Sequence, residues 1–419
     1  MQAKSEDSLT QAQLTEAAPP PAAAIPSMAI LWLSLAAFCT SMSARVADAQ
    51  LPHLAAEFGV SLGGASYIIT CFAIAFGASQ LLLGSLGDRY GKYLAVGWAC
   101  AASAVTTALC GLAPGFSLLL AARLLAGATV ATIIPFSMAW IGDVVPYARR
   151  QPVLARFLLG QIVGLSAGVM LGGLAVDHLG WRVPFFGIAV AFAALSMALL
   201  SMNRRLPARA RQVHKSQGSA VRRTLTGFAQ LLTLQWPRIV LLTVFAEGAC
   251  VYGALAFIAS HLHRTHGLSL SVAGSLLMLF GLGGVLYATL SGRLVGTLGE
   301  VGLARWGGAF LGGGLLAAAV APSWQWAIPG CFFSGLGFYM LHNTLQINAT
   351  QMAPERRGAA VSAFSACFLL GQSAGIALAG MLMEQIGTTT VIAVGAAGAL
   401  VVGINFGRLR ARKPAAVCG

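Results

Sequence analysis

Residues 84–92 read Gly-Ser-Leu-Gly-Asp-Arg-Tyr-Gly-Lys and connect the end of one long apolar run, 65–86, to the start of another, 94–113. A helix needs about 20 residues to cross the hydrocarbon of a bilayer, and each run is long enough. Glycine permits a tight reversal of the chain, and the charged side chains of the stretch keep that reversal in water. The stretch therefore predicts two membrane-spanning helices joined by a short turn at the membrane surface.

The composition extends this interpretation to the whole chain. Of 419 residues, 57% are apolar and only 9% are charged, whereas a soluble domain carries about 25% charged residues. Lipid must therefore cover much of the surface. A transmembrane β-barrel needs alternating segments of roughly 10 residues, but the apolar runs here are long and continuous. We expect an all-α membrane protein.

Twelve apolar segments are long enough to span a bilayer, and one long polar gap divides them into six and six. The predicted spans are 28–50, 65–86, 94–113, 116–141, 153–176, 184–203, 238–260, 269–291, 302–321, 324–348, 358–384 and 388–407. The predicted organisation is a disordered tail (1–27), a six-helix bundle (28–203), a basic linker (204–237), a second six-helix bundle (238–407) and a tail (408–419).

The formal charge of +14 indicates topology rather than nucleic-acid binding. The basic residues cluster in short loops on the side that also holds the N-terminus, as the positive-inside rule describes. We therefore expect a multi-pass protein of the cell (inner) membrane with both termini in the cytoplasm.

The N-terminal segment does not have the pattern of a signal peptide. The cysteines form no metal-binding pattern, and a phosphate-binding P-loop is absent, so we expect no metal, no cofactor and no ATP-driven step.

Two segments of the chain share a series of landmarks. Leu158-Leu159-Gly160-Gln161 in the fifth segment matches Leu369-Leu370-Gly371-Gln372 in the eleventh. Each follows a loop with a proline and two consecutive arginines. Such landmarks indicate a duplicated fold, in which Gly160 and Gly371 occupy matching places in two parallel halves.

The stretch at 84–92 resembles the G-x-x-x-D-R-x-G-K/R motif of the major facilitator superfamily. The resemblance implies two six-helix bundles that rock about a central cavity, with this loop acting as a cytoplasmic gate. The alternative is a plain basic turn. The expected gate residues are Gly84, Asp88, Arg89, Gly91 and Lys92, with Asp143, Arg149 and Arg357 as partners.

Two further segments are similar to superfamily motifs with one substitution each. Arg123 lies in a segment resembling the helix-four pattern R-x-x-Q-G, where Ala126 replaces glutamine; the alternative is an arginine that snorkels to the surface. Residues 168–173 resemble the antiporter motif G-P-x-x-G-G, with Val169 in place of proline; the alternative is a role in packing alone. The glycines expected on one packing face are Gly164, Gly168, Gly172 and Gly173.

Acidic residues in apolar segments are candidates for proton coupling. Arg45 and Asp48 end the first segment in a string that resembles the drug:proton antiporter branch, and the alternative is a surface ion pair that caps the helix. Glu247 is placed near the middle of the seventh segment, and we expect it to face the cavity. The candidates are therefore Glu247 and Asp48, with Arg123 as a modulator.

The tenth segment and its following loop are similar to bacterial exporters of the arabinose- or drug-efflux permease type. Its polar side chains are candidates for the substrate cavity, although hydrogen bonding between helices is an alternative role for them. The cavity candidates are Gln161, Gln372, His342, Asn343 and Gln346.

Together these resemblances imply a transporter, not an enzyme, that exports a drug or metabolite in exchange for protons. Its expected partners are a small-molecule substrate, protons and the lipid bilayer, and we expect a functional monomer. One alternative is a nutrient uniporter or proton symporter of the same superfamily. Another is a membrane sensor or scaffold that has lost transport, which the polar residues within the spans argue against.

Overall fold

The computed structural model describes residues 27–83, 90–211, 220–353 and 357–412, and these residues contain helices but no strand. The first half consists of α2 (Ser27–Arg45), α3 (Leu51–Phe58), α4 (Leu62–Leu83), α6 (Lys92–Leu112), α7 (Phe116–Val130), α8 (Ile133–Val144), α9 (Tyr147–His178) and α10 (Val183–Arg205). A short 3₁₀ turn (Ala208–Arg211) and α11 (Ala220–Thr233) follow. The second half consists of α12 (Gln235–His266), α13 (Leu270–Val320), α14 (Ala327–Gln351) and α15 (Arg357–Arg412).

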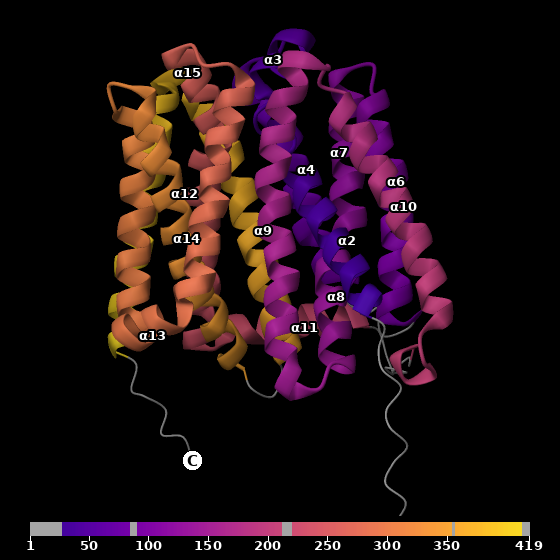
Figure 1. Cartoon of the computed structure of the whole chain (residues 1–419). Coiled ribbons are helices and arrows are strands. Elements are labelled where there is room, and N and C mark those ends of the chain that lie inside the picture. The colour runs from indigo at the N-terminus through magenta and orange to yellow at the C-terminus, as the bar shows by residue number, and fades with distance from the viewer. Residues whose placement is uncertain (1–26, 84–89, 212–219, 354–356, 413–419) are drawn as a thin grey trace, which may run out of the picture.

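The long helices stand side by side, with the first half of the chain on the right of Figure 1 and the second half on the left. Helix α3 lies at the upper end of this bundle and α11 at the lower end, so we call these the α3 end and the α11 end. The predicted tail lies, except for Ser27, outside the described residues.

Among the described residues, nine helical segments are long and apolar enough to cross a membrane, and one of them, Phe116–Val144, contains both α7 and α8. Two of them are helix pairs, because α13 is interrupted at Gly299 (φ 61°) and α15 at Gly387 (φ 79°). Positive φ favours glycine, which has no Cβ to clash with the backbone. With α14, whose middle carries several polar side chains, these helices account for the twelve predicted spans.

Two of the predicted helices are interrupted a few residues before a proline. The segment 116–141 was expected to be one helix, but a turn at residues 131–132 separates α7 from α8. Pro135 explains the break, because a proline ring clashes with the carbonyl group four residues earlier. The first span likewise leaves the α-helical conformation after Arg45, and Pro52 lies in the first turn of α3.

Glycines on α9 let two helices of the first half pack backbone to backbone. A Cβ atom at Gly168 would lie 2.5 Å from the carbonyl oxygen of Met42 on α2, and one at Gly164 would overlap that of Phe38. Gly172 meets the backbone in the same way at Val46, directly after the end of α2. The predicted packing face is therefore occupied by the first helix, as small residues allow in membrane bundles.

The same contact occurs in the second half. Gly160 packs against the backbone of α2, and Gly371 packs against the backbone of α12 at Phe245. Each glycine therefore lies against the first helix of its own half, as the sequence landmarks predicted. Between the halves, α4 packs against α15 and α9 against α13. Gly173 is a correction to the predicted packing face, because it meets Leu270 at the start of α13 in the other half.

Candidate functional site

A cavity of about 830 Å³ lies between the two halves. Its wall is formed by α2, α4, the start of α6, α8 and α9 from the first half and by α12, α14 and α15 from the second. It extends from Arg45 to Lys92 and Thr350, which lie toward the α11 end. Pockets for small organic ligands typically measure about 300–1,000 Å³, so this cavity is large enough for one.

Most of the predicted polar residues do line this cavity. Gln161 and Gln372 come from α9 and α15, and His342 and Gln346 come from α14. Asn343 is a correction, because its side chain donates a hydrogen bond to the Tyr287 hydroxyl at 2.8 Å in a different part of the bundle. Residues 342 and 346 share a helix face, whereas a residue one position along is rotated by about 100°.

Arg45 and Asp48 form an ion pair of 2.5 Å inside the bundle. Their side chains are 2% and 0% exposed, so the alternative of a surface pair is wrong. Arg45 also reaches across to the second half, where its guanidinium lies 4.7 Å from the centroid of the Tyr252 ring. Both Arg45 and Tyr252 line the cavity, and they form its floor nearest the α3 end. No pattern in the sequence around Tyr252 marks it as a cavity residue.

Arg123 points into the first half rather than to the surface. It is fully buried, and it donates hydrogen bonds to the backbone carbonyls of Ile68 (3.2 Å) and Ser43 (2.9 Å). Its guanidinium lies 4.2 Å from the centroid of the Phe72 ring, and its charge interacts with Asp48. The alternative of an arginine that snorkels to the surface is therefore wrong. Arg123 lies instead beside the Arg45–Asp48 pair.

Glu247 lies one layer behind the cavity wall. Its carboxylate is fully buried, and its Oε2 atom lies 2.8 Å from Nδ1 of His342. His342 lines the cavity, stacks on Phe338 at 5.0 Å between ring centroids, and lies at a tilt against Phe368 at 4.6 Å. The other carboxylate oxygen of Glu247 has no hydrogen-bond partner among the described residues. The expectation that Glu247 faces the cavity directly needs correction, because His342 stands between them.

The predicted gate is described only in part. Lys92 at the start of α6 forms an ion pair of 2.5 Å with Asp143 at the end of α8. Gly91, which precedes α6, has a φ of 91°, so glycine is needed at this position of the motif. Gly84, Asp88 and Arg89 lie outside the described residues, and so do the side chains of Arg149 and Arg357.

The two halves meet closely at the α3 end. The backbone N–H of Gly63 donates to Glu384 at 3.2 Å, and that of Ser271 donates to Asp177 at 2.6 Å. A Cβ atom at Gly63 would overlap the Gly380 backbone, so α4 and α15 are in direct backbone contact there. In this conformation the contacts close the α3 end, while the cavity reaches toward the α11 end.

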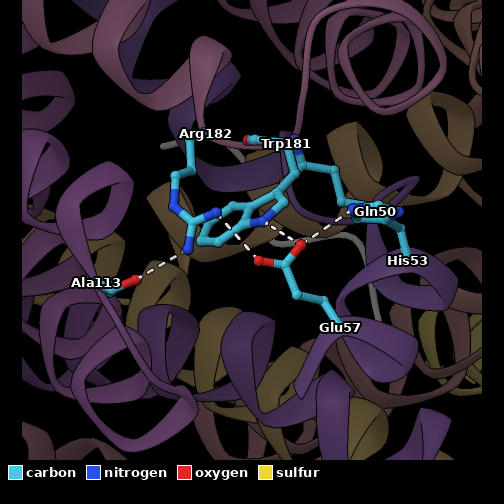
Figure 2. Close-up of polar contacts among 6 residues, drawn as sticks. All are labelled: Gln50, His53, Glu57, Ala113, Trp181 and Arg182. Carbon is cyan, nitrogen blue, oxygen red and sulfur yellow. Dashed lines mark hydrogen bonds and ion pairs between the residues drawn. The ribbon is translucent and has the colours of Figure 1, made fainter. Parts of the chain in front are cut away.

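A polar cluster at the α3 end ties α3 to the loop before α10 (Figure 2). Glu57 accepts hydrogen bonds from Trp181 Nε1 at 2.8 Å and from Arg182 at 3.1 Å, and Gln50 donates to the Trp181 carbonyl at 3.1 Å. Partial burial raises the pKa of Glu57, but these hydrogen bonds and the Arg182 charge outweigh it, so the pKa lies below its usual value. No sequence pattern indicates this cluster, because Glu57 and Trp181 are 124 residues apart in the chain.

Comparison with known proteins places this geometry in a family. The model of the Major Facilitator Superfamily matches residues 33–356. The chain is 23% identical to the uncharacterized MFS-type transporter YceJ of Bacillus subtilis (strain 168), over 80% of this chain and 84% of that protein. It is 28% identical to the multidrug export protein EmrB of Escherichia coli (strain K12), but that match spans only 52% of this chain and 45% of EmrB.

The solved structures agree on the fold. A crystal structure of a mutant of the nucleoside transporter NupG superposes with a TM-score of 0.75, over 92% of this chain and 99% of that one, at 14% sequence identity. This likeness shows a shared fold and no more. The family comprises transporters rather than enzymes, and the apolar helices identify a multi-pass membrane protein. The chain therefore belongs to the Major Facilitator Superfamily.

Proposed function

We propose that this chain exports a small organic molecule across the cell membrane by alternating access, in exchange for protons. The observation that carries the proposal is the cavity of about 830 Å³ between the halves, which extends toward the α11 end while hydrogen bonds and a backbone contact between the halves close the α3 end. A cavity that is accessible from one side at a time is what alternating access requires. The similarity to EmrB, a multidrug export protein, favours export over import.

The charge pattern supports an orientation with the α11 end in the cytoplasm. The linker and the last helix bring a concentration of arginines to this end, and the positive-inside rule assigns such loops to the cytoplasm. In this orientation the observed conformation takes up substrate from the cytoplasm. The two six-helix bundles, 28–203 and 238–407, then rock as units about the cavity, and a single chain suffices.

Two buried carboxylates support proton coupling. A buried carboxylate is costly to ionise unless it is paired, so its protonation depends on whether water or a cation reaches it. Glu247 contacts the cavity through His342, and Asp48 contacts it through Arg45. We assign the transported proton to Glu247, because the partner of Glu247 is itself titratable, whereas Arg45 stays charged. A proton crossing 100 mV supplies about 2.3 kcal/mol from the membrane potential alone.

The test begins with a survival screen of an overexpressing strain against many toxic compounds and metabolites. Each protective compound is then followed in everted membrane vesicles, in which export appears as uptake into the lumen. We expect uptake that requires an acidic lumen and that stops when a protonophore is added. Uptake into intact cells, or transport that is indifferent to the protonophore, would contradict proton-coupled export and favour a symporter or a uniporter.

A further inference from the structure

The wall of the cavity has an uneven charge. Among the described residues that line it, Arg45 and Lys92 are cations and no residue is a carboxylate. Lys92 is neutralised at the α11 end by its ion pair with Asp143. Glu247 is separated from the cavity by His342. The charge that remains in contact with the interior of the cavity is therefore that of Arg45.

Arg45 is not fully satisfied by its neighbours. One terminal nitrogen pairs with Asp48, but Nε and the other terminal nitrogen have no hydrogen-bond partner among the described residues. The side chain is only 2% exposed, so bulk water does not solvate these donors. Leaving buried donors of a charged group unpaired costs free energy, which an acceptor on a ligand would recover.

The ion-pair group formed by Arg45, Asp48 and Arg123, to which Glu247 does not belong, also carries an excess positive charge. Asp48 interacts with two guanidinium groups, those of Arg45 and Arg123, and one carboxylate balances only one of them. Both arginines and the aspartate are at least 98% buried, where charges are weakly screened. A second negative charge at the floor of the cavity would neutralise the remaining positive charge of these two arginines.

The rest of the wall suits an apolar body. Aromatic rings line the cavity from both halves, and glutamine side chains lie among them. The lining aromatic residues are Phe72, Phe76, Phe136, Tyr252, Phe364 and Phe368. From this arrangement we propose that the cavity binds amphipathic organic anions, with a carboxylate or sulfonate head at Arg45 and an aromatic or aliphatic body against the phenylalanines. This inference names the substrate class of the export proposed above and rests on that proposal only for the direction of transport.

The test uses three probes that share one ring and differ in charge: 2-naphthoate, 2-naphthamide and 2-naphthylmethylammonium. Binding of each to the purified full chain in lipid nanodiscs is measured by titration and by the shift of the unfolding temperature. We expect 2-naphthoate to bind at least tenfold more tightly than 2-naphthylmethylammonium. A bound ligand stabilises the folded chain in proportion to its occupancy, so the temperature shift should follow the same order.

The variants isolate Arg45. Removing Arg45 alone would leave Asp48 buried without its partner, so the double variant Arg45→Gln, Asp48→Asn removes both charges together. We expect it to lower the naphthoate preference at least fivefold and to change 2-naphthamide affinity less than twofold. Arg45→Lys keeps the charge and should retain part of the preference. Arg410→Gln is the matched control, because Arg410 also pairs with a carboxylate, Glu300 at 2.7 Å, but does not line the cavity.

The possible outcomes separate this inference from the proposed function. Equal or tighter binding of the ammonium probe, or an unchanged preference in the double variant, would overturn the anion site even where export of other compounds is observed. If naphthoate binds with the expected preference but everted vesicles show no proton-dependent uptake, the export proposal fails and the anion site stands.

Discussion

The guanidinium of Arg45 in the first half lies 4.7 Å from the ring centroid of Tyr252 in the second half. This contact joins the halves at the floor of the cavity, in the conformation whose α3 end is closed. A cation–π contact of this kind contributes about 0.5–2 kcal/mol, depending on how far it is desolvated. It therefore stabilises one conformation of the transporter over the other.

Tyr252→Leu should shift the conformational equilibrium away from the α3-closed form by roughly 2- to 30-fold, because it removes a contact of about 0.5–2 kcal/mol. The measurement is the distribution of distances between spin labels at Ala56→Cys and Arg264→Cys, two exposed positions on opposite halves at the α3 end. Tyr252→Phe retains an aromatic ring and serves as the control. An identical distribution in the leucine variant would show that the contact does not influence the equilibrium.

Glu247→Gln should remove the pH dependence of transport or abolish transport, because glutamine keeps the size of the side chain but does not bind the transported proton. The readout is the rate of uptake into everted vesicles across a range of lumenal pH. Glu300→Gln is a control, since Glu300 pairs with Arg410 outside the cavity. A wild-type rate with a wild-type pH profile would reject the assignment, and Asp48→Asn would then be the variant to measure.

Gly164→Ala should destabilise the protein, because the added Cβ atom would overlap the carbonyl oxygen of Phe38 on α2. Overpacking of a tight interface typically costs about 1–3 kcal/mol. The unfolding temperature of the purified protein measures the effect. The matched control is Gly187→Ala on α10, where a Cβ atom meets nothing within 4 Å. Equal unfolding temperatures for the two variants would show that α2 and α9 do not need this close approach.

The Lys92–Asp143 pair should matter for turnover more than for stability. Asp143 is 51% exposed, and exposed ion pairs contribute about 0–1 kcal/mol to folding. Lys92→Gln should therefore reduce the transport rate while the amount of folded protein stays close to that of the wild type. The charge swap Lys92→Asp, Asp143→Lys should recover part of the rate. A wild-type rate in Lys92→Gln would leave the pair without a role in gating.

Glu57 should stabilise the α3 end at neutral pH and lose this effect in acid. Its pKa in the folded chain lies below its usual value of 4.5, so the stabilisation is complete above that value and is lost as the pH falls through the folded pKa. Thermal unfolding of wild type and Glu57→Gln at several pH values should show a difference near neutrality that shrinks below pH 4.5. A difference that does not depend on pH would indicate that the carboxylate charge is not involved.

The sequence was sufficient for features that repeat along the chain. Apolar length predicted the twelve spans, and the spacing of Gly164, Gly168 and Gly172 predicted one packing face, on which the structure places the chain of the first span. Periodicity carries this information because a helix repeats every 3.6 residues. Because proline disrupts the helical turn that precedes it, Pro52 and Pro135 also predict a helix break before each of them. The predicted spans did not include these breaks.

Features that depend on contacts between distant segments were not predictable. Nothing local to Tyr252 indicates that Arg45 reaches it from the other half, and nothing near Glu247 indicates that His342 covers it. Asn343 was assigned to the cavity with its neighbours, because the sequence does not reveal which face of α14 points inward. The direction of a side chain around a helix is fixed by tertiary packing.

Because His342 stands between Glu247 and the cavity, evolution can change the cavity wall separately from the carboxylate. Residues on the wall, such as Gln161 or Phe136, can be exchanged without altering the immediate neighbours of the carboxylate. If Glu247 carries the transported proton, as we propose, a lineage under selection by a new toxin can acquire a different cargo and keep its energy source. Mutations at His342 form the exception, because they would alter cargo and energy source together.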